Sequence, residues 1–301
     1  MNLDHLRVLV AVLESGTFTR AAARLKLSQP AVSQHMAALE REAGVTLFER
    51  SGRLRVPTDA AHELALRGRA AMAALDDADR TAEQLRGLRG GRLAVGATES
   101  VGTYRVPAML GAFAKQHPDV ELRMDIADAS DLVQGLRSRD LDVGIICEMA
   151  PAEGVETSSL ADERLEPVRG SESPMASGKA SLERFLEQPF IARERGSGIG
   201  RAVDRWLLEQ ENGPRPAMEL GSLEAMKQAV LSGLGVSILP ETAVKTDADR
   251  GTLRVGRFHG TPLKARVDVA VLEGRRAPKP LEAFLRGVLG SRAKALIGDA
   301  D

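Results

Sequence analysis

Residues 18–40, FTRAAARLKLSQPAVSQHMAALE, decide the fold at the start of this chain. Three consecutive alanines within residues 18–25 leave room for a second helix to approach that segment closely. Ser28 is a good N-cap for the second helix, and Pro30 falls in its first turn, where a missing N–H costs nothing. Apolar residues then recur at helical spacing and are expected to face a core: Val32, Met36 and Leu39. The stretch therefore predicts two short helices joined by one tight turn.

The face of the second helix that points away from this core is uncharged, with side chains that are short or carry an amide: Gln29, Ala31, Ser33, Gln34 and His35. A solvated helix face usually carries Lys and Glu, so this face is expected to meet a partner. A helix-turn-helix whose second helix enters the DNA major groove fits the pattern. The alternative is a structural helical hairpin without a role in nucleic-acid binding. Gln29, Ser33 and Gln34 are the expected base readers. Pro30 and Ala31 would contact a thymine methyl.

A β-hairpin wing is predicted over residues 46–56, where two short strand patterns flank a turn. The region carries three arginines: Arg50, Arg53 and Arg55. Arg50 and Arg53 are the stronger candidates for contact with phosphates or the minor groove, and ordinary solvated charge is the alternative. Thr19 and Arg20, at the start of the first helix of the pair, are also expected to contact phosphates.

Charge and helical patterning predict more than one copy of the chain on DNA. The formal net charge of the 301 residues is −1, and residues 1–60 hold eight Arg and Lys against six Asp and Glu. So mild a positive bias predicts that useful DNA affinity needs two or more copies on one site. The alanine-rich helical stretch 58–88 has one apolar face and is expected to pair with its copy.

From residue 92 the pattern changes to strands that alternate with helices, which predicts two α/β lobes in series with a cleft between them. The alternation favours parallel sheets, whereas residues 151–185 show no clear pattern. The expected fold class is α/β with an N-terminal winged helix-turn-helix, a long linker helix and a two-lobed effector domain. The expected domain bounds are 1–58, 59–90 and 91–301. Lobe I is expected at about 91–161 and 265–293, and lobe II at about 162–264.

Candidate effector-binding residues stand where strands end and helices begin: Thr98, Glu99, Ser100, Ser130, Ser197 and Ser222. Hydroxyl groups and free N–H groups at helix starts suit a carboxylate, phosphate or sulfate. The helix starts are expected to converge in the cleft between the lobes. The alternative is that each hydroxyl is an ordinary N-cap. Glu99 is unfavourable beside an anion and would instead receive an amine or a hydroxyl.

Several classes of function lack their motifs in this sequence. Cys147 is the only cysteine, which excludes an intramolecular disulfide; a buried small hydrophobe is expected, with oxidant sensing as the alternative. The histidines show no metal-ligand spacing and no nucleotide-binding or catalytic motif occurs, so no metal, cofactor or enzymatic activity is expected. Neither a signal peptide nor a membrane-spanning run is recognised, which predicts a cytoplasmic protein without a membrane partner.

The N-terminal motifs resemble those of the LysR-type transcriptional regulators: FTRAAA (18–23), LSQPAVS (27–33), LE (39–40) and LFER (47–50). Two stretches of the second domain follow the same family: PAMLGAFAKQHPDVEL (107–122) and VLSGLGVSILP (230–240). The resemblance covers nearly the whole chain. His35 departs from it, because the family often has Arg or Gln at this position.

The resemblance implies a DNA-binding transcriptional regulator that is switched by a small anionic metabolite bound between the two lobes. It also implies a homodimer or homotetramer on a pseudo-palindromic operator, with two recognition helices about one helical turn apart. The resemblance also allows RNA polymerase as a further partner. It does not distinguish activation of transcription from repression. A solute-binding protein is the alternative, because the second domain alone looks like a periplasmic binding protein; an enzyme is a more distant one. The first 60 residues argue against a solute-binding protein.

Overall fold

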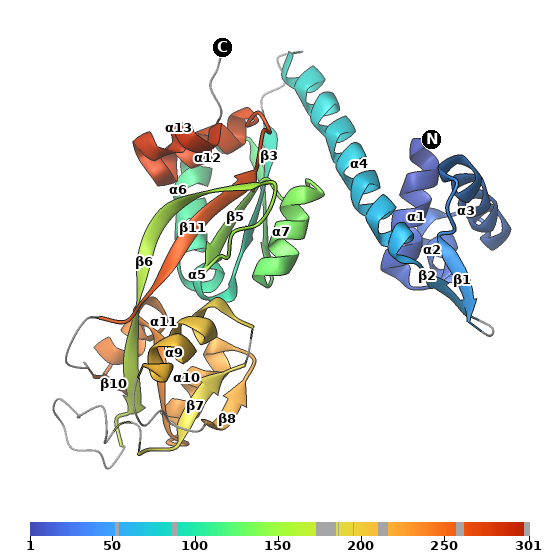
Figure 1. Cartoon of the computed structure of the whole chain (residues 1–301). Coiled ribbons are helices and arrows are strands. Elements are labelled where there is room, and N and C mark those ends of the chain that lie inside the picture. Colours follow the sequence, from blue (N-terminus) through green and yellow to red (C-terminus); the bar gives the residue numbers. More distant parts are fainter. Residues whose placement is uncertain are drawn as a thin grey trace. The chain divides into compact units, whose positions relative to one another are not determined.

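A computed structural model of the chain (Figure 1) describes residues 1–51, 54–85, 90–172, 185, 187–194, 196–209, 216–256 and 262–297. The chain divides into two compact units, each of which is described by itself. Unit 1 contains residues 1–91 and the short stretch 135–140, and unit 2 contains residues 92–134 and 141–301. Among the described helices, none is long and apolar enough to cross a membrane.

Unit 1 begins with three helices: α1 (Leu3–Ser15), α2 (Phe18–Leu25) and α3 (Gln29–Ala43). A side chain caps the start of each helix by accepting a backbone N–H, and the caps are Asn2, Thr17 and Ser28. A residue in the left-handed conformation ends each helix, and these are Gly16, Lys26 and Gly44. Each N-cap is worth about 1 kcal/mol, so short polar residues set the helix boundaries that the sequence pattern predicts.

The core of unit 1 lies between these three helices. The predicted core side chains Val32, Met36 and Leu39 are fully buried, together with Leu9 of α1. Of the three alanines in α2, Ala21 and Ala22 are buried and Ala23 is exposed. The predicted helix-turn-helix is therefore confirmed, with two small residues rather than three at the close helix contact.

The wing and a long helix complete unit 1. Strands β1 (Phe48–Ser51) and β2 (Leu54–Pro57) pair antiparallel, and α4 (Asp59–Leu85) follows. Thr58 joins the two parts, because its hydroxyl donates to the carbonyl of Thr46 (2.9 Å) and accepts from the N–H of Ala61 (3.3 Å). The predicted wing and linker helix are both present.

Unit 2 is built on nine described strands that form one sheet, in the order β4-β3-β5-β11-β6-β9-β7-β8 with β10 also paired to β6. The strands of its first half are β3 (Gly91–Ala97), β4 (Val120–Ile126), β5 (Val143–Cys147) and β11 (Lys264–Leu272). The others are β6 (Val155–Gly170), β7 (Phe190–Arg193), β8 (Pro216–Leu220), β9 (Val236–Pro240) and β10 (Leu253–Val255).

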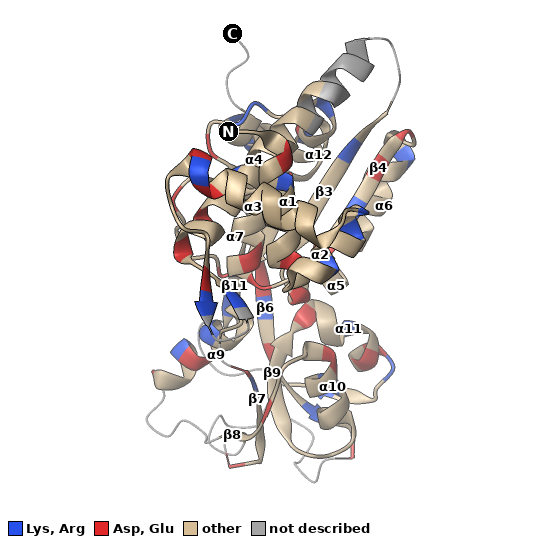
Figure 2. Cartoon of the chain, turned by 90° about the vertical axis from the view of Figure 1, so that its right-hand side faces the viewer, with Lys and Arg blue, Asp and Glu red and all other residues tan. Residues whose placement is uncertain are grey.

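The helices of unit 2 connect these strands. They are α5 (Glu99–Tyr104), α6 (Val106–Gln116), α7 (Ala129–Arg137), α9 (Gly198–Leu208), α10 (Leu223–Leu231), α11 (Glu241–Asp249), α12 (Lys279–Leu289) and α13 (Lys294–Ile297). A short 3-10 turn (Gly290–Ala293) separates the last two, where one helix was expected. Figure 2 shows acidic and basic residues interspersed along the chain.

The sheet is mixed rather than parallel, and one long strand divides it into two lobes. Strands β3 and β5 are parallel, as are β7 and β9, but β6 and β11 run antiparallel to their neighbours. β6 pairs with β11 up to Arg164 and with β9 from Leu165 onward. Figure 1 shows this strand running through both lobes. We therefore call the β4-β3-β5-β11 side lobe I and the β9-β7-β8 side lobe II.

Candidate functional site

The exposed face of α3 carries the predicted base readers. Gln29, Pro30 and Gln34 are exposed, whereas Ala31 and Ser33 are half-buried. The amide of Gln29 donates to the hydroxyl of Ser33 across one helical turn (3.1 Å). This pairing orders two of the readers on one face, so amide and hydroxyl groups stand ready for base edges in a groove.

His35 is not part of that face. Its ring lies edge-on against the ring of His5 in α1, with centroids 5.2 Å apart. Helical geometry explains this, because residue 35 lies next to the buried Met36 and three residues after the buried Val32. The expectation that His35 points outward with Gln34 is therefore wrong.

The wing is held to α3 by one carboxylate. Glu40 Oε1 accepts the N–H groups of Leu47 (2.8 Å) and Phe48 (3.2 Å), which fixes where β1 starts relative to α3. Arg50 on β1 is exposed and stands directly opposite Arg55 on β2. Like charges at directly paired positions are unfavourable unless an anion lies nearby, which favours a phosphate-contacting surface.

The structure describes three of the remaining candidates for DNA contact and leaves out the fourth. Thr19 and Arg20 are exposed in the first turn of α2. Arg55 has a local role as well, since its guanidinium lies 5.1 Å from the centre of the Phe18 ring. Arg53 lies outside the described residues.

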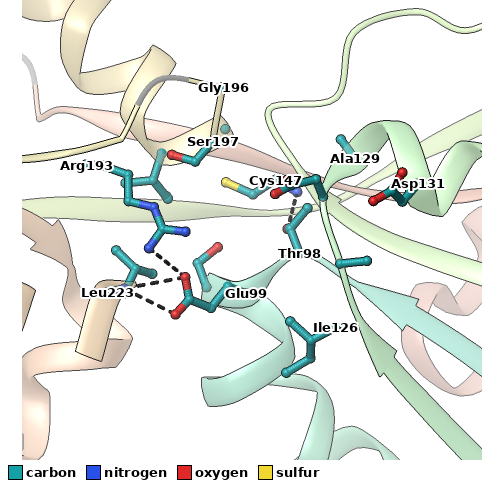
Figure 3. A pocket seen from close by; sticks show the side chains of 15 residues that line it. Thr98, Glu99, Ile126, Ala129, Asp131, Cys147, Arg193, Gly196, Ser197 and Leu223 are labelled. Carbon is teal, nitrogen blue, oxygen red and sulfur yellow. Dashed lines mark hydrogen bonds and ion pairs between the residues drawn. The ribbon is translucent and has the colours of Figure 1, made fainter. Parts of the chain in front are cut away.

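Unit 2 contains a pocket of about 490 Å³ between lobe I and lobe II (Figure 3). Four predicted effector residues line it: Thr98, Glu99, Ser100 and Ser197. Arg193, Asp128 and Asp131 also line it, and sequence reasoning did not single them out. Among the described side chains, no three His, Cys, Asp or Glu residues gather in a way that could hold a metal ion.

Lobe I contributes a wall of hydroxyl groups beside Cys147. The hydroxyl of Thr98 accepts the backbone N–H of Cys147 (3.0 Å), so Thr98 ties β3 to β5 and forms no side-chain cap bond to α5. Ser100 is buried and its hydroxyl bonds to the thiol of Cys147. Burial raises the pKa of that thiol to about 12, so it stays protonated at neutral pH. Cys147 is a buried small residue, as predicted.

Lobe II contributes the start of α9. Ser197 is its N-cap, and the hydroxyl accepts the N–H of Gly200 (2.9 Å). The helix has eleven residues, and its first two residues, Gly198 and Ile199, line the pocket. Such a helix start favours a negatively charged group.

Glu99 crosses the pocket from lobe I to lobe II (Figure 3). Its Oε1 atom accepts the hydroxyl of Ser222 (3.0 Å) and the N–H of Leu223 (3.2 Å) at the start of α10. Its Oε2 atom lies 2.7 Å from Nη1 of Arg193. Ser222 is the N-cap of α10, as predicted, but its hydroxyl bonds to Glu99 and it is not among the residues that line the pocket.

Ser130 does not reach the pocket. α7 starts at Ala129, one residue earlier than expected, so Ser130 is an exposed residue inside the helix rather than its cap. Asp128 and Asp131 flank the helix start instead and line the pocket. Acidic residues in the first turn stabilise a helix, so these carboxylates have a local structural role as well.

Arg193 is the buried cation of the pocket, and sequence reasoning missed it. It ends the short strand β7, and only 9% of its side chain is exposed. The signal is weak but present: an arginine that directly follows Phe190, Ile191 and Ala192 is a charge at the end of an apolar strand. Charged groups are rarely buried without a partner, so such a position indicates a site.

Comparisons with known proteins agree with this architecture. The family described as "Bacterial regulatory helix-turn-helix protein, lysR family" matches residues 3–62, and that described as "LysR substrate binding domain" matches residues 86–291. The RuBisCO operon transcriptional regulator of Allochromatium vinosum is 32% identical over 295 residues, which cover 98% of this chain and 97% of that protein.

Two solved structures are also similar. A full-length OxyR variant from Pseudomonas aeruginosa matches with a TM-score of 0.72 and 26% identity, over 97% of this chain and 96% of that one. The regulatory domain of CcmR from Synechocystis, solved in complex with 2-PG, matches with a TM-score of 0.61 and 25% identity, over 67% of this chain and 97% of that one. The family matches cover both units, and the chain therefore belongs to the LysR-type family of DNA-binding transcriptional regulators.

Proposed function

We propose that the pocket of unit 2 binds a small organic anion and that this binding changes how the DNA-bound protein is arranged. The observation that carries the proposal is the set of donors in one pocket: the hydroxyls of Ser100 and Ser197, the start of α9 and the buried guanidinium of Arg193. These groups suit a carboxylate or phosphate. The carboxylates of Asp128 and Asp131 favour an effector that also carries hydroxyl or amine donors.

The complex of the CcmR regulatory domain with 2-PG supports an anionic effector, because that domain matches most of unit 2. A protein that changes its lobe geometry when it binds a ligand must bind the ligand more tightly in one geometry than in the other. A pocket with walls from both lobes meets this requirement, since ligand contacts to lobe I and lobe II depend on their separation.

The DNA-binding half of the proposal rests on unit 1. Gln29, Ser33 and Gln34 would read bases, with Pro30 and Ala31 against thymine methyls. The expected phosphate contacts come from Thr19, Arg20, Arg50 and Arg53. We propose domain bounds of 1–58, 59–90 and 91–301, a homodimer or homotetramer on a pseudo-palindromic operator, and a cytoplasmic location, since bacterial DNA lies there.

The test uses the full-length chain with 2-PG, inorganic phosphate and sulfate as probes. A probe at 100 times its Kd should raise the free energy of unfolding by about 2.7 kcal/mol, which thermal unfolding detects. Ser197→Ala should lower the affinity for the probe about tenfold, because a charge-assisted hydrogen bond is lost. Ser130→Ala is the matched control, because Ser130 is an exposed serine outside the pocket.

A DNase footprint and a DNA-bending assay, with and without the probe, complete the test. The DNA is an operator selected from a random-sequence library by the wild-type chain. A probe that binds tightly and leaves both the footprint and the bend unchanged contradicts the proposed switch. Equal losses for Ser197→Ala and Ser130→Ala contradict the proposed pocket.

A further inference from the structure

The lobe II side of the pocket holds an anion-binding arrangement that a side chain of lobe I occupies. Three groups of lobe II converge on it: the hydroxyl of Ser222, the N–H of Leu223 and the guanidinium of Arg193. The occupant is the carboxylate of Glu99, which is 28% exposed and belongs to the first turn of α5. Figure 3 shows Arg193 and Glu99 pointing toward each other from opposite sides of the pocket.

The arginine is not saturated by this carboxylate. Nη1 of Arg193 lies 2.7 Å from Oε2 of Glu99, whereas Nε is buried and has no hydrogen-bond partner among the described residues. A guanidinium has five N–H donors, and burying it is costly unless those donors are bonded. Arg193 is 91% buried beside the pocket, and its Nε–H therefore remains as a donor that the Glu99 carboxylate does not use.

We propose that Glu99 is a built-in competitor of the effector, whose anionic group takes Arg193 and the start of α10 from the Glu99 carboxylate. This inference rests on the proposed function, because it assigns the effector a subsite within the same pocket. It reverses the sequence-based expectation for Glu99: the side chain does not receive part of the ligand but occupies the place of the ligand's anionic group.

Competition with a tethered carboxylate selects the class of effector. Glu99 is attached to the chain, so its carboxylate meets the three donor groups of lobe II at a high effective concentration, about millimolar or above. A free monocarboxylate has the same charge as the Glu99 side chain, so it gains little binding free energy by replacing that side chain. A dianionic oxyanion, such as a phosphate ester, can use the donors that now bind the Glu99 carboxylate and also the unbonded Nε–H of Arg193. The subsite therefore favours phosphorylated effectors over simple carboxylic acids.

Displacement of Glu99 would also remove a direct contact between the lobes. A second contact would remain, because Tyr104 of lobe I donates its hydroxyl to Glu224 of lobe II (3.0 Å). The burial of Tyr104 and its bond to Glu224 raise its pKa to about 12, so this second contact persists across neutral and moderately alkaline pH. The effector would thus replace one interlobe contact with its own bridge while another keeps the lobes in register.

The test measures binding of inorganic phosphate to full-length variants by isothermal titration. Glu99→Gln keeps the shape and an acceptor oxygen but removes the charge, so it should bind phosphate about tenfold more tightly than wild type. Asp131→Asn is the matched control, because it removes one negative charge from the same pocket without touching Arg193 or α10. The phosphate affinity of Asp131→Asn should rise by less than about threefold. Adding Arg193→Gln to Glu99→Gln should abolish the gain.

Two outcomes overturn the inference. Equal gains for Glu99→Gln and Asp131→Asn would mean that general electrostatics act rather than competition, and no gain for Glu99→Gln would mean that Glu99 does not compete. Glu99→Ala provides a second variant if the first folds poorly, and it should gain at least as much. These binding measurements use no DNA. The proposed function fails if bound anions leave the footprint and the bend unchanged, whereas this inference fails only on the phosphate affinities of the variants.

Discussion

Gly198 at the start of α9 packs directly on the backbone carbonyl of Cys147 at the end of β5. A β-carbon at position 198 would overlap the carbonyl oxygen and lie 2.9 Å from the carbonyl carbon, which is backbone and cannot rotate away. Lobe II therefore approaches lobe I closely beside the pocket, at a position where only hydrogen fits. Nη2 of Arg201 strengthens the contact by donating to the carbonyl of Glu148 (2.9 Å).

Gly198→Ala should move the two lobes apart at this point. The expected cost is about 1–3 kcal/mol of unfolding free energy from the steric overlap, measured by urea denaturation. Anion affinity should fall together with stability, because the two pocket walls separate. Gly111→Ala in α6 is the control: nothing lies within 4 Å of the added carbon, and the change should stabilise by about 0.4–1 kcal/mol. A Gly198→Ala chain with unchanged stability and affinity would show that the lobes do not meet here.

Glu163 should prove to be the main electrostatic support of the lobe junction. It is 1% exposed, accepts the Nε–H of Arg105 (2.8 Å) and accepts the N–H and hydroxyl of Thr242 (3.2 and 2.9 Å). Glu163→Ala should cost roughly 1.5–3 kcal/mol, the usual range for hydrogen bonds to a charged group. Asp162→Asn, on the neighbouring and half-exposed side chain, should change stability by less than about 1 kcal/mol. Similar losses in the two variants, measured by denaturation, would refute this role.

Strongly periodic segments could be predicted from the sequence almost to the residue. The helix Val106–Gln116 and the strand Val120–Ile126 have the predicted bounds, because a proline in the first turn and His117-Pro118 mark the helix ends locally. The helix-turn-helix was equally predictable, since its caps and core residues all lie between Thr17 and Gly44.

The long strand β6 could not be predicted in this way. Residues 155–170 are largely polar, and their pairing partners Lys264–Leu272 and Val236–Pro240 lie 67 to 117 residues away in sequence. Non-local pairing overrides local preference in such strands. The mixed sheet follows from the same cause, because the return strands β6 and β11 break the parallel order that the strand-helix alternation predicts.

The pocket was predictable in part. Helix starts at Ser197 and Ser222 follow from N-cap chemistry and are present. The pairing of Glu99 with Arg193, 94 positions apart, depends on how the two lobes face each other, and no local pattern encodes that. Sequence reasoning recognised that Glu99 conflicts with an anion, but a charge at the end of an apolar strand was too weak a signal to pair Arg193 with it.

Gln34 and Arg50 should have different effects on DNA binding. Gln34→Ala should weaken binding to a selected operator by about 1–3 kcal/mol, because a base-reading amide is lost. Binding to random DNA should weaken far less. Arg50→Ala should weaken both DNAs about equally and lower the salt dependence of binding by about one unit of log–log slope. Fluorescence anisotropy over a salt series measures both effects. If Gln34→Ala weakens random DNA as much as the operator, Gln34 does not read bases.

Cys147 should not respond to oxidants in the native protein. It is 1% exposed, and burial followed by the negative charge of Glu148 raises its pKa to about 12 from a usual value of 9.0. The thiolate is the reactive form, so alkylation by iodoacetamide at pH 8 should be slow in the native chain and fast in denaturant.

The same shift makes the stability of the chain depend on alkaline pH. Because the folded thiol holds its proton up to about pH 12 and the unfolded thiol loses it near pH 9, the contribution of Cys147 is fully present below pH 9. It is lost as the pH rises from 9 toward 12, and Cys147→Ser, whose hydroxyl does not titrate there, should show a flatter stability curve over that window. Rapid native alkylation at pH 8, or identical curves for wild type and Cys147→Ser, would refute a buried protonated thiol and revive oxidant sensing for this cysteine.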